Sequence, residues 1–466
     1  FFLKQQITNI FIRTSLLKSI YLRTCFRFVY MSSTKEPQSG LAEQATKVIK
    51  CDGDSISYTD NFFRDIDKTL TCDDQKSKAS QTLTVLKQLV AFNLVAFPTE
   101  TVYGLGASAL SSTAVSKIYK AKGRPSDNPL IVHVSSLNLL RTFIPPDWTF
   151  PATYQALTER FWPGPLTLLV PTTSSILPNS PISNLVTCGL STVAVRMPAH
   201  PISRALIAES GVPIAAPSAN LSGRPSPTTA QHVERDLKTR IPMILDGGPC
   251  QVGVESTVVD GLNPDGRLRI LRLGGLSVED IQTCLLEAGL DQSNGKPILA
   301  GVYNQDYRDK ELEAKPTTPG MKYKHYAPHA KIIILNPVLS DSHQDQINGG
   351  ADELISEIGR AGSESSKSLR IGLMMIEDSP LHKSFIACTT TPQKHQFFYS
   401  NLGPELQPEI SAQRLFASLR YLDEQLEVDI IYVERLSEIG LGATVMERLR
   451  KASGQSSSPS VKMSHS

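Results

Sequence analysis

The 466-residue chain lacks the signatures of several common catalytic and metal-binding machineries. It has no GxxxxGK[ST] phosphate loop, no complete GxGxxG dinucleotide fingerprint and no GxSxG nucleophile elbow. Its seven cysteines are scattered without a CxxC pair or a Cys/His cluster, which argues against structural zinc and favours free thiols in a reducing compartment. A P-loop enzyme is therefore excluded, and a ligand would have to be held by separate groups on several loops.

The chain also lacks a strong charge of one sign and a long apolar run. Its formal net charge is only +2, so a nucleic-acid surface would have to be a local patch. No run approaches the roughly 20 mostly apolar residues that span a membrane, so no membrane insertion is expected. With 40% hydrophobic and 20% charged residues, the composition is that of a globular protein, and the length predicts two or three domains.

Acidic residues are absent from residues 1–30, which carry five basic residues among hydroxyls, aliphatics and aromatics. This pattern resembles a mitochondrial presequence. The alternative is untranslated sequence, because the chain starts at Phe1 and Met31 could be a second start. Use of both starts would supply mitochondrion and cytoplasm, and this remains a hypothesis.

The most informative stretch runs from Leu94 to Val134. An apolar run at Leu94–Phe97 predicts a buried strand, and a hydroxyl-rich turn follows it. We expect Gly104 and Gly106 to let the backbone turn tightly there. Together with the basic loop that follows, this strand and turn indicate an anionic ligand.

A helix is expected after that turn. Ser111 or Ser112 can cap its start and Gly123 can end it. Lys122 and Arg124 then lie together in a proline-bounded loop before a second apolar run, 130–134.

The remaining chain divides by its pattern of apolar runs. An amphipathic helix at 80–93 precedes short strands that alternate with helices, which predicts a mixed α/β domain. A polar, glycine- and proline-rich stretch follows, and a second βαβ-type layer comes after it. We assign a flexible segment at 31–78, a catalytic domain at 79–290, a linker at 291–330, a C-terminal domain at 331–452 and a disordered tail at 453–466.

Four further polar constellations stand out. On the strand STVAVRMP, alternation places Thr192, Ala194 and Arg196 on one face, and arginine suits a carboxylate or phosphate. A surface ion pair is the alternative reading of Arg196. The loop APSANLSGRPSPT offers short donors, although most such loops bind nothing. GVESTVVD and RILRLGG are weak signals by themselves.

Five motifs occur along the chain in a fixed order: PTETVYGLG, KAKGRPSDNPLIVHV, STVAVRMP, APSANLSGRPSPT and PGMKYKHYAP. Because of these motifs and their order, the chain resembles the Sua5/YrdC family in its long, Sua5-type form. The resemblance covers residues 80–330 most strongly. It implies a twisted mixed α/β sheet with helices around a large basic cavity, and a smaller Rossmann-like C-terminal domain joined by a long linker.

The resemblance implies a threonylcarbamoyl-AMP synthase, a nucleotidyltransferase. L-threonine, bicarbonate and ATP would give threonylcarbamoyl-AMP and pyrophosphate, the first step of the t6A modification of tRNAs that read ANN codons. Carried over residue by residue, the threonine site would comprise Thr101, His133, Arg196, Ala216 and Ser256. The ATP site would comprise Arg124, Asn128, Thr192, Ser218, Ser226, Arg272 and Tyr326. Catalytic charge stabilisation would fall to Lys122, Arg124 and Arg196.

Cofactors and partners follow from the same resemblance. Mg²⁺ is expected with ATP rather than in a protein cage, RNA binding is open, and a threonylcarbamoyl transferase complex would take the product. One alternative is a nucleotide-binding or double-stranded-RNA-binding module without catalysis. Another is the carbamoyl-transfer module of hydrogenase maturation, which the missing CxxC pairs disfavour.

Overall fold

The computed structural model describes residues 46–54, 94–172, 181–293, 295–303, 305–307, 325–335, 368–383 and 395–454. All of them belong to one unit, Ala45–Ser466. The predicted presequence, the helix at 80–93, linker residues 294, 304 and 308–324, and all but the first residues of the tail lie outside the described residues.

Among the described residues, eleven strands form one mixed sheet. Their spatial order is β1 (Lys47–Lys50), β8 (Met243–Asp246), β2 (Val95–Phe97), β3 (Gly104–Ser108), β7 (Ile214–Ala215), β4 (Val132–His133), β6 (Thr192–Arg196), β5 (Leu166–Pro171), β9 (Thr257–Asp260), β10 (Leu268–Arg272) and β13 (Leu299–Val302). The order jumps along the chain, and both parallel and antiparallel pairs occur. Residues from distant motifs are thereby brought to neighbouring strand ends.

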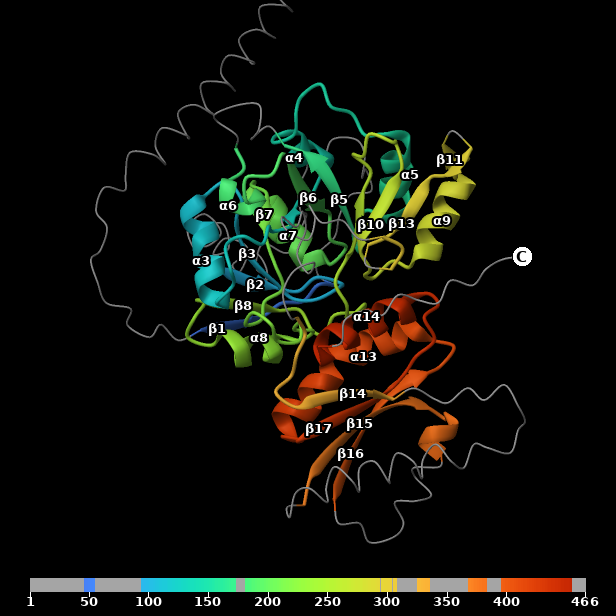
Figure 1. Cartoon of the computed structure of the whole chain (residues 1–466). Coiled ribbons are helices and arrows are strands. Elements are labelled where there is room, and N and C mark those ends of the chain that lie inside the picture. The colour runs from blue at the N-terminus through green and yellow to red at the C-terminus, as the bar shows by residue number, and fades with distance from the viewer. Residues whose placement is uncertain are drawn as a thin grey trace, which may run out of the picture. The chain divides into compact units, whose positions relative to one another are not determined.

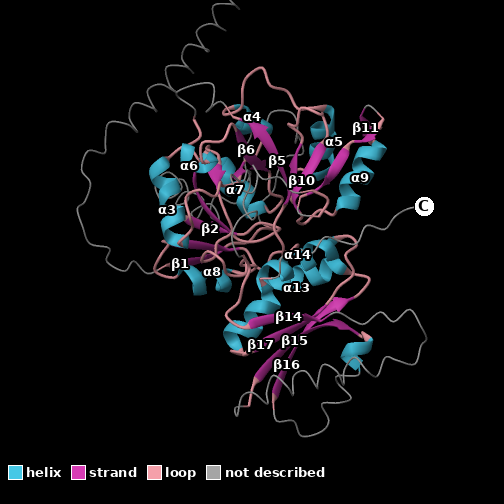
Figure 2. Cartoon of the chain, in the orientation of Figure 1, coloured by secondary structure: helices cyan, strands magenta, loops and turns pink. Residues whose placement is uncertain are grey.

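Helices accompany this sheet (Figures 1 and 2). They are α3 (Ser112–Lys122), α4 (Leu137–Arg141), α5 (Ala152–Phe161), α6 (Asn184–Thr187), α7 (Pro201–Ser210), α8 (Ala230–Leu237) and α9 (Val278–Glu287), and β11 (Gln292–Ser293) pairs with β12 (Lys296–Pro297). The predicted ends of α3 are confirmed. Ser111 Oγ accepts from the Ala114 backbone N–H at 3.2 Å, and Gly123 adopts a left-handed φ of 61°.

Two expectations about local structure are wrong. Gly104 and Gly106 do not form a turn, because both lie within the buried strand β3. A Cβ on Gly106 would come within 2.6 Å of the Phe97 ring, so glycine is required for close strand packing instead. Residues 47–50 are likewise not part of a flexible segment, since they pair with β8 as the parallel edge strand β1. Four residues are too few to show a periodic pattern in sequence.

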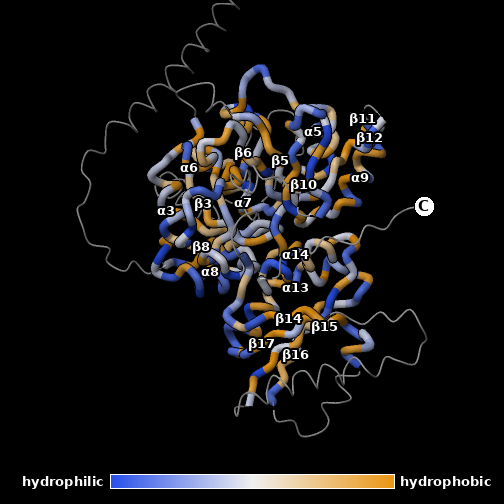
Figure 3. Tube along the Cα trace, viewed as in Figure 1, coloured by the Kyte–Doolittle hydropathy of each residue, from blue (hydrophilic) through white to orange (hydrophobic). Residues whose placement is uncertain are grey.

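The C-terminal domain contains a second sheet. Its described strands are all parallel, in the order β14 (Lys331–Leu335), β17 (Ile430–Glu434), β15 (Arg370–Glu377) and β16 (Gln396–Pro404). Figure 3 shows strands of this sheet as hydrophobic segments. α13 (Pro408–Arg420), a π-helical turn at Tyr421–Gln425, and α14 (Leu441–Ser453) pack on it through residues such as Met374, Leu415 and Val445. The predicted two-sheet α/β architecture is confirmed.

The two domains meet through α13 and α14. Gly253 has a φ of 79°, and a Cβ there would come within 2.4 Å of the Gln413 Cα on α13. Thr444 Oγ1 on α14 donates to the Gly274 carbonyl at 3.0 Å. Among the helices of the described residues, none has the length and apolarity needed to cross a membrane.

Candidate active site

A pocket opens where several strands of the large sheet begin or end. His133 ends β4 and Arg196 ends β6, and the two residues are in parallel register. Ala216 follows β7, Ser256 precedes β9, and Arg272 ends β10. Ten of the predicted site residues line this pocket: Thr101, Arg124, His133, Arg196, Ala216, Ser218, Ser226, Ser256, Arg272 and Tyr326.

Arg196 lies at one corner of the pocket, where three hydrogen bonds hold its guanidinium. Its guanidinium is buried, with Nη2 donating to Glu100 Oε1 at 2.6 Å, Nη1 to Thr101 Oγ1 at 2.7 Å and Nε to the Gly164 carbonyl at 3.1 Å. These bonds use three of the five N–H donors of a guanidinium, which leaves one on each terminal nitrogen. The corner is therefore oriented to bind a carboxylate through two donors.

His133 lies beside this corner as a neutral ring. Burial, with a smaller contribution from Arg196, lowers the pKa of His133 to about 3. Its Nδ1 is buried and has no hydrogen-bond partner among the described residues. A neutral imidazole with a free nitrogen can accept or donate one bond to a small ligand.

Arg272 and Ser256 are in contact in the pocket lining. Arg272 Nη2 donates to the Ser256 carbonyl at 2.8 Å and to Ser256 Oγ at 3.1 Å, while Ser256 Oγ also bonds Thr167 Oγ1 at 2.7 Å. The resemblance assigns these two residues to different substrates. Because they are in contact, both substrates would meet here.

Arg124 is a further basic residue of the pocket lining. Its Nη2 reaches the carbonyls of Asn128 and Pro129, each at 3.3 Å, and its buried Nε has no partner among the described residues. Burial lowers the pKa of Arg124 from its usual range. Ser218 Oγ, which donates to Asn220 Oδ1 at 2.5 Å, lines the same pocket.

Three predicted residues do not line the pocket. Lys122 is buried behind the loop, where Nζ donates to the carbonyls of Ser218 and Asn220, each at 2.5 Å. Burial, followed by repulsion from Arg124, lowers the pKa of Lys122 well below its usual value. Asn128 is buried, and Thr192 begins β6, about 13 Å along the strand from Arg196.

Tyr326 brings the linker to the pocket. Its backbone has a φ of 65°, and the neighbouring Ala327 N–H donates to the Gly223 carbonyl at 2.8 Å. The ring lies 5.2 Å from that of Phe416 and beneath the Arg448 guanidinium, 5.6 Å from its centroid. The linker thus joins the pocket wall to the C-terminal core.

Sequence reasoning gave no site role to two acidic residues, Glu255, which lines the pocket, and Glu100, which does not line it but bonds the Arg196 guanidinium. Glu255 Oε1 accepts from Ser226 Oγ at 2.5 Å. Burial alone would raise the pKa of Glu255, but Arg448 and Arg272 outweigh it and hold that pKa below its usual value. A physical argument could have found Glu100. A buried arginine such as Arg196 requires a carboxylate partner, and Glu100 adjoins the predicted site residue Thr101 in the same motif.

Two family models together match most of the chain. A family model, Sua5_yciO_yrdC, described as telomere recombination, matches residues 70–274, and the model for the C-terminal domain of threonylcarbamoyl-AMP synthase matches residues 276–454. The chain belongs to the Sua5/YrdC family. The resemblance inferred from the motifs is confirmed.

Relatives of this Sua5/YrdC chain match more than three quarters of its length. The threonylcarbamoyl-AMP synthase of Schizosaccharomyces pombe is 42% identical over 77% of this chain and 84% of its own. That of Bacillus subtilis is 40% identical over 85% and 98%. The crystal structure of Pyrococcus abyssi Sua5 complexed with L-threonine has a TM-score of 0.65 and 36% identity, covering 88% of this chain and 98% of that one. These synthases favour an enzyme over a binding module.

Proposed function

We propose that this enzyme uses the pocket to condense L-threonine, bicarbonate and ATP into threonylcarbamoyl-AMP and pyrophosphate. The observation that carries the proposal is the Arg196 corner, in which Glu100 and Thr101 orient a guanidinium toward a pocket that also holds Arg124. A solved relative binds L-threonine, and named relatives are synthases of this product.

The chemistry suits a pocket of fixed charges and short donors. The threonine amine captures bicarbonate as a carbamate with loss of water. A carbamate oxygen then attacks the α-phosphorus of ATP, and the bond to pyrophosphate breaks. Such a transfer needs positioning and charge stabilisation rather than a protein nucleophile.

Each pocket residue then has a proposed role. Arg196 holds the threonine carboxylate, and His133, Ala216 and Ser256 surround the amino acid. Arg124, Ser218, Ser226 and Arg272 face the nucleotide. One charge-assisted contact in such a site contributes about 2 to 4 kcal/mol of transition-state stabilisation.

Magnesium would arrive with ATP as part of the substrate. The pocket carboxylate Glu255 already accepts bonds from Ser226 and Arg448, and Glu100, next to the pocket residue Thr101, accepts a bond from Arg196. Within the described residues, no group of three or more His, Cys, Asp or Glu could hold a metal ion. The donors present therefore fit an ion held by phosphates and water rather than by a protein cage.

The linker would act as a flap over the intermediate. Carbamates and mixed anhydrides hydrolyse, so closure by Tyr326 would exclude water during the transfer. We further propose that the labile adenylate passes to a threonylcarbamoyl transferase complex for tRNA modification, in cytoplasm and mitochondria.

The decisive experiment measures pyrophosphate release from ATP with purified full-length chain. Release should require both L-threonine and bicarbonate, and Arg196→Gln should reduce it by roughly 30-fold to 1,000-fold, as expected for a lost charge-assisted contact. Arg141→Gln, at an exposed helix end, is the matched control and should release pyrophosphate normally. A chain that binds ATP but releases no pyrophosphate under any of these conditions would be a binding module instead.

A further inference from the structure

The pocket loop Ala216–Thr228 has little regular structure, so contacts from other elements must set its shape. It carries Ser218 and Ser226, which line the pocket. Lys122 holds its first half through the Ser218 and Asn220 carbonyls. Its second half is held from the C-terminal domain, at Pro225 directly and at Ser226 through Glu255.

Arg420, the last residue of α13, makes the first of these contacts. Its side chain is only 1% exposed, and Nη2 donates to the Pro225 carbonyl at 2.5 Å. The same guanidinium binds both carboxylate oxygens of Asp236, at 3.1 and 2.8 Å, and Glu424 at 2.8 Å. Arg420 therefore bonds two separate parts of the catalytic domain.

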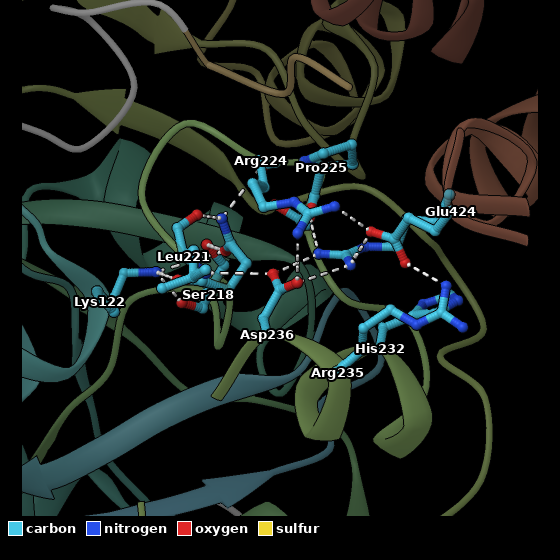
Figure 4. Close-up of polar contacts among 12 residues, drawn as sticks. Lys122, Ser218, Leu221, Arg224, Pro225, His232, Arg235, Asp236 and Glu424 are labelled. Carbon is cyan, nitrogen blue, oxygen red and sulfur yellow. Dashed lines mark hydrogen bonds and ion pairs between the residues drawn. The ribbon is translucent and has the colours of Figure 1, made fainter. Parts of the chain in front are cut away.

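Asp236, on α8, bonds both Arg420 and the pocket loop. Its Oδ2 accepts from the Leu221 N–H at 3.2 Å, and Arg224 lies 3.5 Å from Oδ1. Figure 4 shows Asp236 between Leu221 and Ser218 on one side and Arg224 and Glu424 on the other. The loop is thus anchored at Leu221, Arg224 and Pro225 around one carboxylate.

Arg448, on α14, makes the second contact. Its buried guanidinium donates to Glu255 Oε2 at 3.2 Å from Nε and 3.1 Å from Nη2. The other oxygen of Glu255 accepts from Ser226 Oγ at 2.5 Å. The two arginines of the C-terminal domain therefore hold consecutive residues of the pocket loop, Arg420 by a bond to Pro225 and Arg448 through Glu255, which bonds Ser226.

The energetics of buried ion pairs indicate what these contacts do. Desolvation of a buried pair cancels much of its attraction, so the pair adds little net stability while its fork geometry fixes positions closely. Arg420 is buried and is not among the pocket-lining residues. Its effect on the site must pass through the loop.

We propose that Arg420 is a positioning residue for the ATP half of the active site, which it sets from the C-terminal domain through Pro225 and Asp236. This rests on the proposed function, in which Ser218 and Ser226 of the loop face the nucleotide. The threonine half is held separately, because Arg196, Glu100 and Thr101 make no contact with Arg420. Loss of Arg420 should weaken ATP binding selectively.

The test compares Arg420→Gln with Arg414→Gln, an exposed arginine on the same helix, in the full-length chain. Titration calorimetry gives the Kd of each substrate, and pyrophosphate release gives the KM for ATP. Arg420→Gln should raise both ATP constants about tenfold and change the threonine Kd less than about twofold. Arg420→Lys should recover part of the loss, and Arg414→Gln should match the wild type.

Asp236→Asn provides the coupling test. If Asp236 acts together with Arg420, the double variant R420Q/D236N should bind ATP within about twofold of R420Q alone. If R420Q alone does not fold, the double variant, which removes the Arg420 and Asp236 charges together, is compared with the wild type instead: a raised ATP Kd with an unchanged threonine Kd supports the proposal, and equal changes overturn it.

An unchanged ATP Kd in R420Q, or an equal loss of affinity for ATP and threonine, would overturn the proposal. A wild type that binds ATP but forms no adenylate would overturn the proposed function instead.

Discussion

Lys122 illustrates how residue type and residue position can indicate different roles. A lysine in a basic loop suggests a phosphate ligand, and sequence reasoning gave it that role. In the fold its Nζ donates to the Ser218 and Asn220 carbonyls and lies 3.4 Å from Asn220 Oδ1. At the residue scale, these contacts indicate that Lys122 anchors the pocket loop.

We predict that Lys122→Met lowers the free energy of unfolding by about 2 kcal/mol, because it leaves buried carbonyls without a donor. Pyrophosphate release should fall with it. Urea unfolding measures the first effect, with Lys120→Met, at an exposed position of the same helix, as the control. A variant that loses activity while keeping or gaining stability would restore the phosphate-binding interpretation.

At the scale of elements, the linker residue Tyr326 is part of two structures at once. It lines the pocket and also packs in the C-terminal core against Phe416. Removing its ring would therefore open a cavity as well as the site. A measurement that does not depend on stability is needed to isolate the flap.

The ratio of adenylate recovered to pyrophosphate released is such a measurement. If the flap excludes water, Tyr326→Ala should lower this ratio severalfold, because the intermediate hydrolyses before it leaves. Adenylate yield should fall even at temperatures where the variant remains folded. Tyr326→Phe keeps the ring and should keep the ratio. An unchanged ratio in Tyr326→Ala would show that the linker is a tether only.

The contact between Gly253 and α13 gives a second element-scale prediction. Gly253→Ala combines a left-handed φ with a Cβ 2.4 Å from the Gln413 Cα, so we expect a loss of more than about 3 kcal/mol in the free energy of unfolding. Gly266→Ala has a φ of 68° but no atom within 4 Å of its Cβ, and should cost about 1 kcal/mol. Equal losses in denaturant melts would mean that the α13 contact contributes nothing.

At the scale of the whole molecule, buried histidines make stability depend on pH. Burial lowers the pKa of His133 and His325 to about 3 and that of His232 to about 4, from a usual value of 6.5. The folded chain keeps these rings neutral, whereas the unfolded chain protonates them below pH 6.5. Their contribution to stability is therefore complete above pH 6.5 and is lost as pH falls toward 4 for His232 and toward 3 for His133 and His325.

We predict that the free energy of unfolding is lower at pH 5 than at pH 7, with each ring contributing up to about 1.4 kcal/mol per pH unit. His232→Gln removes one titrating ring outside the pocket and keeps an acceptor for the Thr228 N–H. Its stability should fall less steeply between pH 6.5 and 5 than that of the wild type, as measured by urea unfolding. Parallel slopes would contradict the assignment.

Much of the fold followed from local patterns. The apolar runs at β2 and β4 and the caps of α3 are local features, and they were predicted to within a few residues. β16 and β3 were missed, because a nine-residue edge strand of mixed polarity and a glycine strand carry no clear alternation. Ten of the thirteen predicted site residues meet in one pocket because the motifs follow strand ends.

The sequence by itself determined which residue types enter the site, since hydroxyls, arginines and glycines at fixed spacing are properties of contiguous motifs. Only the tertiary structure decided which partners they have. Arg420 and Asp236 are 184 positions apart, and the pairing of Arg196 with Glu100 spans 96. Burial and pairing depend on many segments packing together, so no local pattern specifies them. For this reason the motifs indicated the reaction, whereas the role of the C-terminal domain came only from the fold.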